Sequence, residues 1–254
     1  MKQRVITAVC MIAVALPCMI LGGVWLRGLL TLVVFLGTLE YVRNVCDYTD
    51  VRYYLLTFIM AAMTLLSVFL PAYRFQISAI VLLALFFLNV NSADWDVMKI
   101  SYLFLMFSLL SVGIECFDII RSFGITEALL VLFETYFADS FALIGGKAFG
   151  KHKLNERISP NKTVEGSLCG YLSGALIGIV WGLLLTSFTK GVVLASAFIV
   201  PFVSQIGDLA FSSIKRYFGI KDFSNIFPGH GGMLDRIDSL IFALAVFNII
   251  LGIL

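Results

Sequence analysis

Charged side chains are scarce in this sequence, in which Asp, Glu, Lys and Arg together make up only 13% of the 254 residues. Hydrophobic residues make up 60%, and the mean hydropathy is +1.00. A typical soluble domain carries about 25% charged residues, so this composition excludes the soluble globular class. We therefore expect a polytopic membrane protein.

Three common signatures are also missing, and each absence excludes a class of structure. The five cysteines form no C-x-x-C pair, so we expect small apolar residues rather than zinc ligands or disulfides. No A-x-A cleavage site follows the first apolar run, which we interpret as a retained span rather than a signal peptide. No internal repeat, low-complexity tract or soluble domain is evident, which favours a single membrane unit.

The apolar runs themselves are long enough to cross a bilayer as helices. They predict an all-α fold of about nine transmembrane helices, with the first turn at Trp25–Gly28. The expected spans are 5–25, 28–45, 52–70, 75–91, 98–117, 125–146, 166–187, 191–210 and 237–254.

Lys and Arg are distributed unevenly over the loops between these spans. Only four of the eighteen fall on one side, and they are Arg27, Arg74, Arg121 and Lys190. Because basic residues accumulate in cytoplasmic loops, this bias predicts a cytoplasmic N-terminus. The loops 147–165 and 211–236 then face the same compartment and are expected to converge on one site. We expect residues 1–124 to form a transmembrane scaffold and residues 125–254 to form the catalytic region.

Four aspartates lie at the end of the eighth span, in the loop after it or at the start of the ninth: Asp208, Asp222, Asp235 and Asp238. Asp235 and Asp238 are three residues apart and lie on one face of a helix. Carboxylate oxygens in this arrangement suit Mg²⁺, which takes one or two carboxylates and completes its shell with water and phosphate. The alternative is structural: these aspartates cap the ninth helix or pair with nearby Lys and Arg.

A glycine-rich turn, Pro228-Gly229-His230-Gly231-Gly232, precedes the ninth span. Glycines allow unusual backbone torsions and close approach to a ligand. We expect exposed N–H groups at the start of the following helix, where an anion is favoured. His230 is interpreted as a phosphate donor or a proton acceptor, or else as a residue that only closes the turn.

The loop 147–165 is cationic. Its Gly145, Gly150 and Lys151 are not a P-loop, because His152 stands where that motif needs a hydroxyl. What remains are lysines together with the hydroxyls of Ser159 and Thr163. The alternative is that the lysines lie near anionic lipid headgroups while Ser159 and Pro160 open the next helix.

Taken together, these motifs resemble those of the phosphatidate cytidylyltransferase (CDP-diacylglycerol synthase) family. The family's pattern S-x-[apolar]-K-R-x4-K-D, followed by H-G-G-[apolar]-x-D-R-[apolar]-D, is matched at Ser212, Lys215, Arg216, Lys221, Asp222, His230, Gly231, Gly232, Asp235, Arg236 and Asp238. A second similar region includes Asp139 and residues 146–166, where Asn161 and Val164 depart from the commoner Lys and aromatic residue. The resemblance covers residues 136–240.

The resemblance implies the Mg²⁺-dependent reaction of CTP with phosphatidate to give CDP-diacylglycerol and pyrophosphate, with a second metal ion left open. It implies a metal site at Asp208, Asp235 and Asp238. The implied catalytic residues are Lys215, Arg216, Lys221, Asp222, His230 and Arg236. The implied substrate-binding residues are Asp139, Lys151, Ser159, Lys162, Thr163, Gly231 and Gly232.

The expected partners are CTP, phosphatidate and membrane lipids, without nucleic acid, and a homodimer is left open. The expected location is a bacterial inner membrane, with several crossings and the active site facing the cytoplasm. Two alternatives stay open: a CTP-dependent enzyme for another lipid, of the polyprenol kinase or CDP-archaeol synthase type, and an anion or lipid transporter. A CDP-alcohol phosphatidyltransferase is excluded because its D-x-x-D-G-x-x-A-R run is absent.

Overall fold

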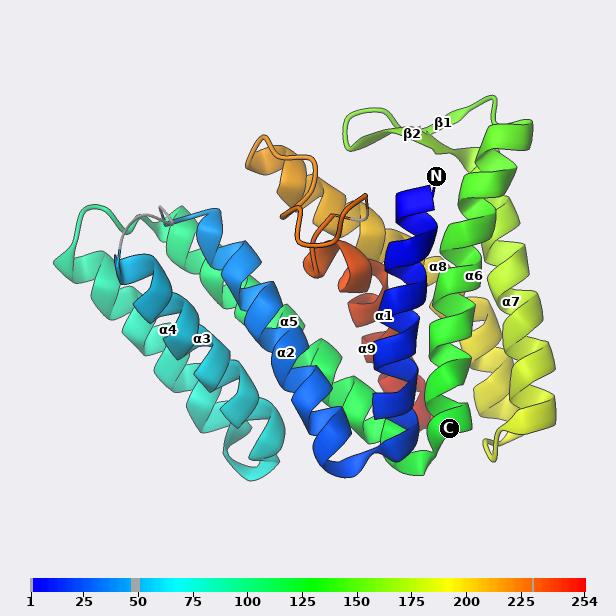
Figure 1. Ribbon diagram of the computed structural model, residues 1–254, viewed down its shortest axis with the longest axis horizontal. Coiled ribbons are helices and arrows are strands. Elements are labelled where there is room, and N and C mark those ends of the chain that lie inside the picture. The colour runs from blue at the N-terminus through cyan, green and yellow to red at the C-terminus, as the bar shows by residue number, and fades with distance from the viewer. Residues whose placement is uncertain (1, 47–50, 230) are drawn as a thin grey trace. The chain divides into compact units, whose positions relative to one another are not determined.

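The computed structural model describes residues 2–46, 51–229 and 231–254, with only the backbone described for residues 2–6 and 8. Within these ranges the regular secondary structure is helical, apart from one short β-hairpin (Figure 1). The elements are α1 (Lys2–Leu21), α2 (Gly23–Arg43), α3 (Val51–Phe69), the 3₁₀ turn η1 (Pro71–Tyr73), α4 (Arg74–Asn91), α5 (Val97–Phe123), α6 (Ile125–Phe149), β1 (Lys153–Asn155), β2 (Ser159–Thr163), α7 (Val164–Leu185), α8 (Lys190–Tyr217) and α9 (Leu234–Ile253).

Eight helices in the described part of the chain are long and apolar enough to cross a membrane. They are α2 to α9, with η1 joined to α4, while α1 adds a shorter apolar stretch over Val9–Leu21. The all-α, multi-pass membrane architecture expected from the sequence is confirmed.

Several boundaries differ from the prediction. The first turn lies at Gly22 and Gly23, where φ is 64° and 51°, and not at 25–28, because these glycines adopt the left-handed backbone that other residues avoid. The helix α8 runs to Tyr217, seven residues beyond the predicted end at 210, and stops before Gly219, whose φ is 67°. Residues 211–217 are therefore helical and not loop.

The chain forms two compact units. One comprises residues up to Glu115 together with Asp222–Asp235, and the other comprises Cys116–Lys221 together with Arg236–Leu254. The first unit therefore includes the glycine-rich segment that precedes α9. The division of labour expected between residues 1–124 and 125–254 stays a prediction.

In the unit that contains α6, α7 and α8, α7 packs through a stripe of buried glycines: Gly166, Gly170, Gly174, Gly178 and Gly182. A Cβ atom at Gly174 would lie 2.7 Å from the carbonyl oxygen of Glu134 on α6 and 2.8 Å from the Pro201 ring on α8. The opposite face carries exposed leucines, Leu168, Leu172 and Leu176. The helix α7 is apolar on all sides, but its side chains differ in size: small residues contact the protein, and large ones lie on the exposed face.

In the other unit, α2 and α5 supply much of the core. Val34 and Val42 of α2 and Leu103 and Leu110 of α5 are fully buried. Gly37 allows the two helices to approach, since a Cβ atom there would lie 3.3 Å from Leu110 Cδ1. The five cysteines of the chain are all free thiols, and of these only Cys116 is buried.

Candidate active site

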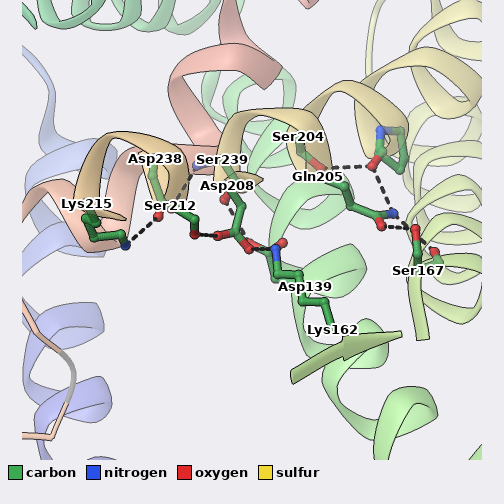
Figure 2. Close-up of polar contacts among 11 residues, drawn as sticks. Asp139, Lys162, Ser167, Ser204, Gln205, Asp208, Ser212, Lys215, Asp238 and Ser239 are labelled. Atoms are coloured by element: carbon green, nitrogen blue, oxygen red, sulfur yellow. Dashed lines mark hydrogen bonds and ion pairs between the residues drawn. The ribbon is translucent and has the colours of Figure 1, made fainter. Parts of the chain in front are cut away.

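A strand and a helix bring together the first charged pair. Lys162 lies on β2, which pairs antiparallel with β1, and its ammonium group forms an ion pair with Asp208 of α8 (Figure 2). One turn further along α8, the Ser212 hydroxyl lies 3.4 Å from Asp208 Oδ1. Both side chains of the ion pair keep part of their surface exposed, 30% for Lys162 and 26% for Asp208. This pair is therefore open to a ligand.

A second charged pair lies deeper. Lys215 of α8 places its Nζ atom 3.8 Å from Oδ2 of Asp238 on α9, and the two side chains are only 9% and 11% exposed. The Ser239 amide donates a 2.8 Å hydrogen bond to Asp238 Oδ1. A buried charge is costly unless it is paired and hydrogen-bonded, so the two residues depend on each other.

A third carboxylate, Asp139 of α6, accepts a 2.8 Å hydrogen bond from the Ser239 hydroxyl (Figure 2). It interacts electrostatically with Asp208, Lys162 and Arg236, and Asp238 interacts with both Asp208 and Asp139. We name these six residues the charge cluster: Asp139, Lys162, Asp208, Lys215, Arg236 and Asp238. It combines three carboxylates with three cations.

The helix α8 is fixed to α7 one turn before Asp208. Gln205 accepts a hydrogen bond from the Ser167 hydroxyl and donates to the Ser167 carbonyl oxygen at 3.2 Å and to the Pro201 carbonyl oxygen at 3.3 Å (Figure 2). Ser204 also donates to the Pro201 carbonyl oxygen, at 3.0 Å. These contacts limit how far Asp208 can shift relative to α7.

The hairpin that carries Lys162 is held at both ends. At one end Glu165 accepts hydrogen bonds from the backbone of Lys151 and His152, at 3.0 and 3.2 Å, and contacts His152 Nδ1 at 2.6 Å. At the other end Arg216 Nε donates to the Ile158 carbonyl oxygen at 3.2 Å. The 147–165 loop thus contacts Arg216, in the first part of the predicted 211–236 loop, while convergence of the two loops on one site stays a prediction.

In the unit that comprises residues up to Glu115 and Asp222–Asp235, two carboxylates accept hydrogen bonds from the segment that precedes α9. Asp235 Oδ2 accepts from the amides of Phe223 at 2.8 Å and Gly232 at 2.9 Å. Glu40 of α2 accepts from the amides of Met233 at 2.7 Å and Leu234 at 2.8 Å. The expectation of exposed N–H groups at the start of α9 is therefore wrong for residues 232–234, because these amides already donate to carboxylates.

The glycines of this segment do adopt the torsions expected of them. Gly229 and Gly231 have φ values of 77° and 80°, a region that favours glycine. Phe227 donates a 2.9 Å backbone hydrogen bond to the Gly231 carbonyl oxygen, which closes the turn. His230 lies outside the described residues.

Other predicted residues lie outside the charge cluster. The Thr163 hydroxyl caps α7 by accepting from the Gly166 amide at 3.1 Å, and Ser159 lies in β2, so the helix does not open at Ser159-Pro160. Lys151, Lys221 and Asp222 have exposed side chains. Their predicted roles in binding and catalysis stay predictions, as do those of Arg216, Gly231, Gly232 and Asp235.

The sequence prediction gave no role to several residues that hold the segments described above. Ser212, which the motif names without a role, follows Asp208 by four positions, a helical spacing, and Ser239 directly follows Asp238, so both roles could have been found from local sequence. Glu165 lies in the first turn of α7, where acidic residues are favoured. Glu40 is the one acidic residue of α2, and an acid within an apolar span indicates function by default.

The described residues contain no group of three Asp, Glu, His or Cys side chains arranged to hold a metal ion by themselves. Asp208 and Asp238 nevertheless supply hard oxygen donors, and each pairs with a lysine, Lys162 or Lys215. Mg²⁺ commonly takes only one or two carboxylates and obtains its other ligands from water and phosphate, so the donor set is compatible with it.

The fold and the charge cluster define a class, that of multi-pass helical membrane proteins with paired carboxylates and cations among apolar helices. Comparison with known proteins narrows it: the cytidylyltransferase family model matches residues 2–254. The chain belongs to this family of nucleotidyltransferases.

Its relatives include the phosphatidate cytidylyltransferases of Staphylococcus haemolyticus, at 30% identity over 262 residues, and of Staphylococcus epidermidis, at 31% over 261. The phosphatidate cytidylyltransferase of Staphylococcus aureus is 31% identical over 264 residues. Each comparison covers 99% of both chains.

Proposed function

We propose that this protein acts as a phosphatidate cytidylyltransferase, which converts CTP and phosphatidate into CDP-diacylglycerol and pyrophosphate. The observation that carries the proposal is the charge cluster, in which Lys162 pairs with Asp208 and Lys215 with Asp238 within an otherwise apolar chain. Full-length similarity to phosphatidate cytidylyltransferases supports the choice of substrates.

In this reaction an oxygen of the lipid phosphate attacks the α-phosphorus of CTP. A new P–O bond forms there, the bond from the α-phosphorus to the bridging oxygen of the β-phosphate breaks, and pyrophosphate leaves with that electron pair. The lipid phosphate is largely deprotonated near neutral pH, so the step needs no general base. The protein's task is to position two anions and to stabilise the charge that builds on the transferred group.

Lys162 and Lys215 suit this task because both are already held beside the carboxylates. We propose that their ammonium groups exchange a carboxylate partner for a substrate phosphate, with Lys162 the more accessible of the two. Arg236 belongs to the same cluster, and its buried Nε atom has no hydrogen-bond partner in the described structure, which leaves one donor for a phosphate oxygen.

We propose Mg²⁺ as the cofactor, held by Asp208 and Asp238. When bound, it would neutralise charge on the phosphate oxygens. Asp235 is better suited to a structural role, because its Oδ2 atom already accepts two backbone hydrogen bonds.

We further propose that the charge cluster faces the cytoplasm of a bacterial inner membrane. The excess of Lys and Arg in the loops on that side supports this orientation. CTP is water-soluble and phosphatidate stays in the bilayer, so a site at the ends of membrane helices is open to both.

The test is pyrophosphate release from CTP by the purified protein in detergent, with phosphatidate and Mg²⁺ added or omitted. We expect release only when both are present, and we expect Asp238→Asn to lower kcat by about 100-fold or more because it removes one charge of a buried pair. A chelator should abolish release by the wild type, and excess Mg²⁺ should restore it.

The matched control is Asp94→Asn, because Asp94 is a surface aspartate whose side chain is 75% exposed and which pairs with Arg52, outside the charge cluster. It should retain wild-type kcat. Folded wild-type protein that releases pyrophosphate with a polyprenol or archaeol lipid, and not with phosphatidate, would contradict the proposed acceptor.

A further inference from the structure

Glu40 is the most unusual acidic residue outside the charge cluster. It lies near the end of α2, a membrane span, and it is only 1% exposed. Burying a carboxylate costs free energy, so favourable interactions must offset that cost.

The compensation comes from three hydrogen bonds to one segment of the chain. Glu40 Oε1 accepts from the Ser224 hydroxyl at 2.6 Å and from the Met233 amide at 2.7 Å, and Oε2 accepts from the Leu234 amide at 2.8 Å. Leu234 is the first residue of α9, so Glu40 satisfies amides that have no partner within the helix. A negative charge at this end of a helix is also favourable.

The Glu40 carboxylate also packs closely against the backbone of Gly232. A Cβ atom at Gly232 would lie 2.6 Å from Glu40 Cδ and 2.7 Å from Oε2. Any side chain at position 232 would therefore displace the carboxylate. The second glycine of the Gly231-Gly232 pair is explained by the room that Glu40 needs.

We infer that Glu40 is a positioning residue, which holds the segment from Ser224 to Leu234 and thereby fixes the glycine-rich turn and the start of α9. It acts through this segment and not on a substrate. The kinetic part of the inference rests on the proposed function, since α9 also carries Arg236 and Asp238. The structural part does not.

Glutamate is the required residue at this position. Three donors surround two carboxylate oxygens, so the amide nitrogen of a glutamine would face an N–H or O–H group and lose at least one bond. Aspartate is one methylene shorter and would not reach all three donors.

The structural test is hydrogen–deuterium exchange of the purified protein. In Glu40→Gln, the amides of peptides covering 222–235 should exchange at least about tenfold faster, since one buried hydrogen bond to a charged group is lost. Glu134→Gln is the matched control: Glu134 is also a fully buried glutamate in a span, but it bonds to Ser196 on α8. It should leave exchange of 222–235 unchanged.

The kinetic test uses pyrophosphate release. Glu40→Gln should lower kcat by about tenfold while changing the KM for CTP by less than about threefold, because the segment is misplaced and no substrate contact is removed. Glu40→Asp should not restore kcat. Gly232→Ala should lower kcat in the wild type but have little further effect in Glu40→Ala, because the clash is then absent.

Unchanged exchange of 222–235 in Glu40→Gln would overturn the inference, whatever lipid the enzyme uses. Faster exchange with wild-type kcat would overturn the positioning role in catalysis. Wild-type protein that shows no phosphatidate-dependent release would overturn the proposed function and leave the exchange test standing. Should Glu40→Gln fail to fold, Gly232→Ala provides the same exchange test, since it displaces the same carboxylate.

Discussion

Three acids on α6 show how partners decide the role of a residue. Glu127 accepts from the Ser187 amide at 3.0 Å and hydroxyl at 2.8 Å, and Glu134 accepts from the Ser196 hydroxyl at 3.1 Å. Hydroxyls and amides of this kind join helices within a membrane. Asp139 alone of the three interacts with cations of the charge cluster. We therefore assign Glu134 to helix packing, Glu127 to holding the connection between α7 and α8 at Ser187, and Asp139 to the site.

At this scale the first prediction concerns Lys162. Its ammonium group is more accessible than that of Lys215, so Lys162→Ala should lower kcat for pyrophosphate release by about 100-fold. Lys190→Ala is the control, because Lys190 is exposed and lies at the start of α8, about 27 Å along the helix axis from Asp208. A kcat for Lys162→Ala within about threefold of wild type would show that Lys162 does not stabilise the transition state.

Among the elements, α7 can pack closely against α6 only because glycines line the contact. Its glycines recur every fourth residue, and the backbone of α6 lies directly against them: a Cβ atom at Gly166 would lie 2.6 Å from the Ala142 carbonyl oxygen. Without a hydrophobic driving force in lipid, such close contact supplies the packing energy. The hairpin that presents Lys162 begins and ends at these same two helices, so their spacing also affects the site.

Gly174→Ala should therefore destabilise the protein. The added methyl group would overlap Pro201 and the Glu134 carbonyl oxygen, which should lower the free energy of unfolding by about 1–3 kcal/mol. Thermal unfolding in detergent measures the change. Gly28→Ala is the matched control, since a Cβ atom at Gly28 meets nothing within 4 Å and alanine favours a helix. Equal stability of the two variants would contradict the packing role of the stripe.

For the whole molecule, the open question is on which side of the membrane each end lies. Nine crossings, with α1 as the first, would place the N-terminus in the cytoplasm and the C-terminus outside. A count of eight would place both ends on the same side.

Reporter fusions test the predicted orientation. Green fluorescent protein inserted at Asn155 in the hairpin should fluoresce, because the hairpin is expected in the cytoplasm, and alkaline phosphatase fused after Leu254 should be active, because α7, α8 and α9 cross between the two positions. Alkaline phosphatase that is inactive after Leu254, in a protein that is otherwise produced normally, would place the C-terminus in the cytoplasm and contradict this orientation.

Features that depend on local sequence could be predicted, whereas contacts between residues far apart in the sequence could not. The helices follow from apolar runs, because hydropathy directly measures compatibility with lipid. The end of α8 did not follow, because Ser212, Lys215 and Arg216 lower hydropathy although the backbone stays helical. The motifs indicated most members of the charge cluster. Glu40 was missed because its partner Ser224 is 184 residues away, and no local pattern encodes such a contact.

The length of α8 has a consequence for substrates of unlike solubility. At 1.5 Å per residue, its 28 residues extend for about 42 Å, whereas the hydrocarbon core of a bilayer is about 30 Å thick. If α8 crosses along the bilayer normal from Lys190, Asp208 would lie about 27 Å along its axis, near the boundary between acyl chains and headgroups, and Lys215 and Arg216 would follow at the depth of the lipid phosphates. In that placement α8 would hold the charge cluster at a depth where a lipid need not leave the bilayer and a nucleotide need not enter it.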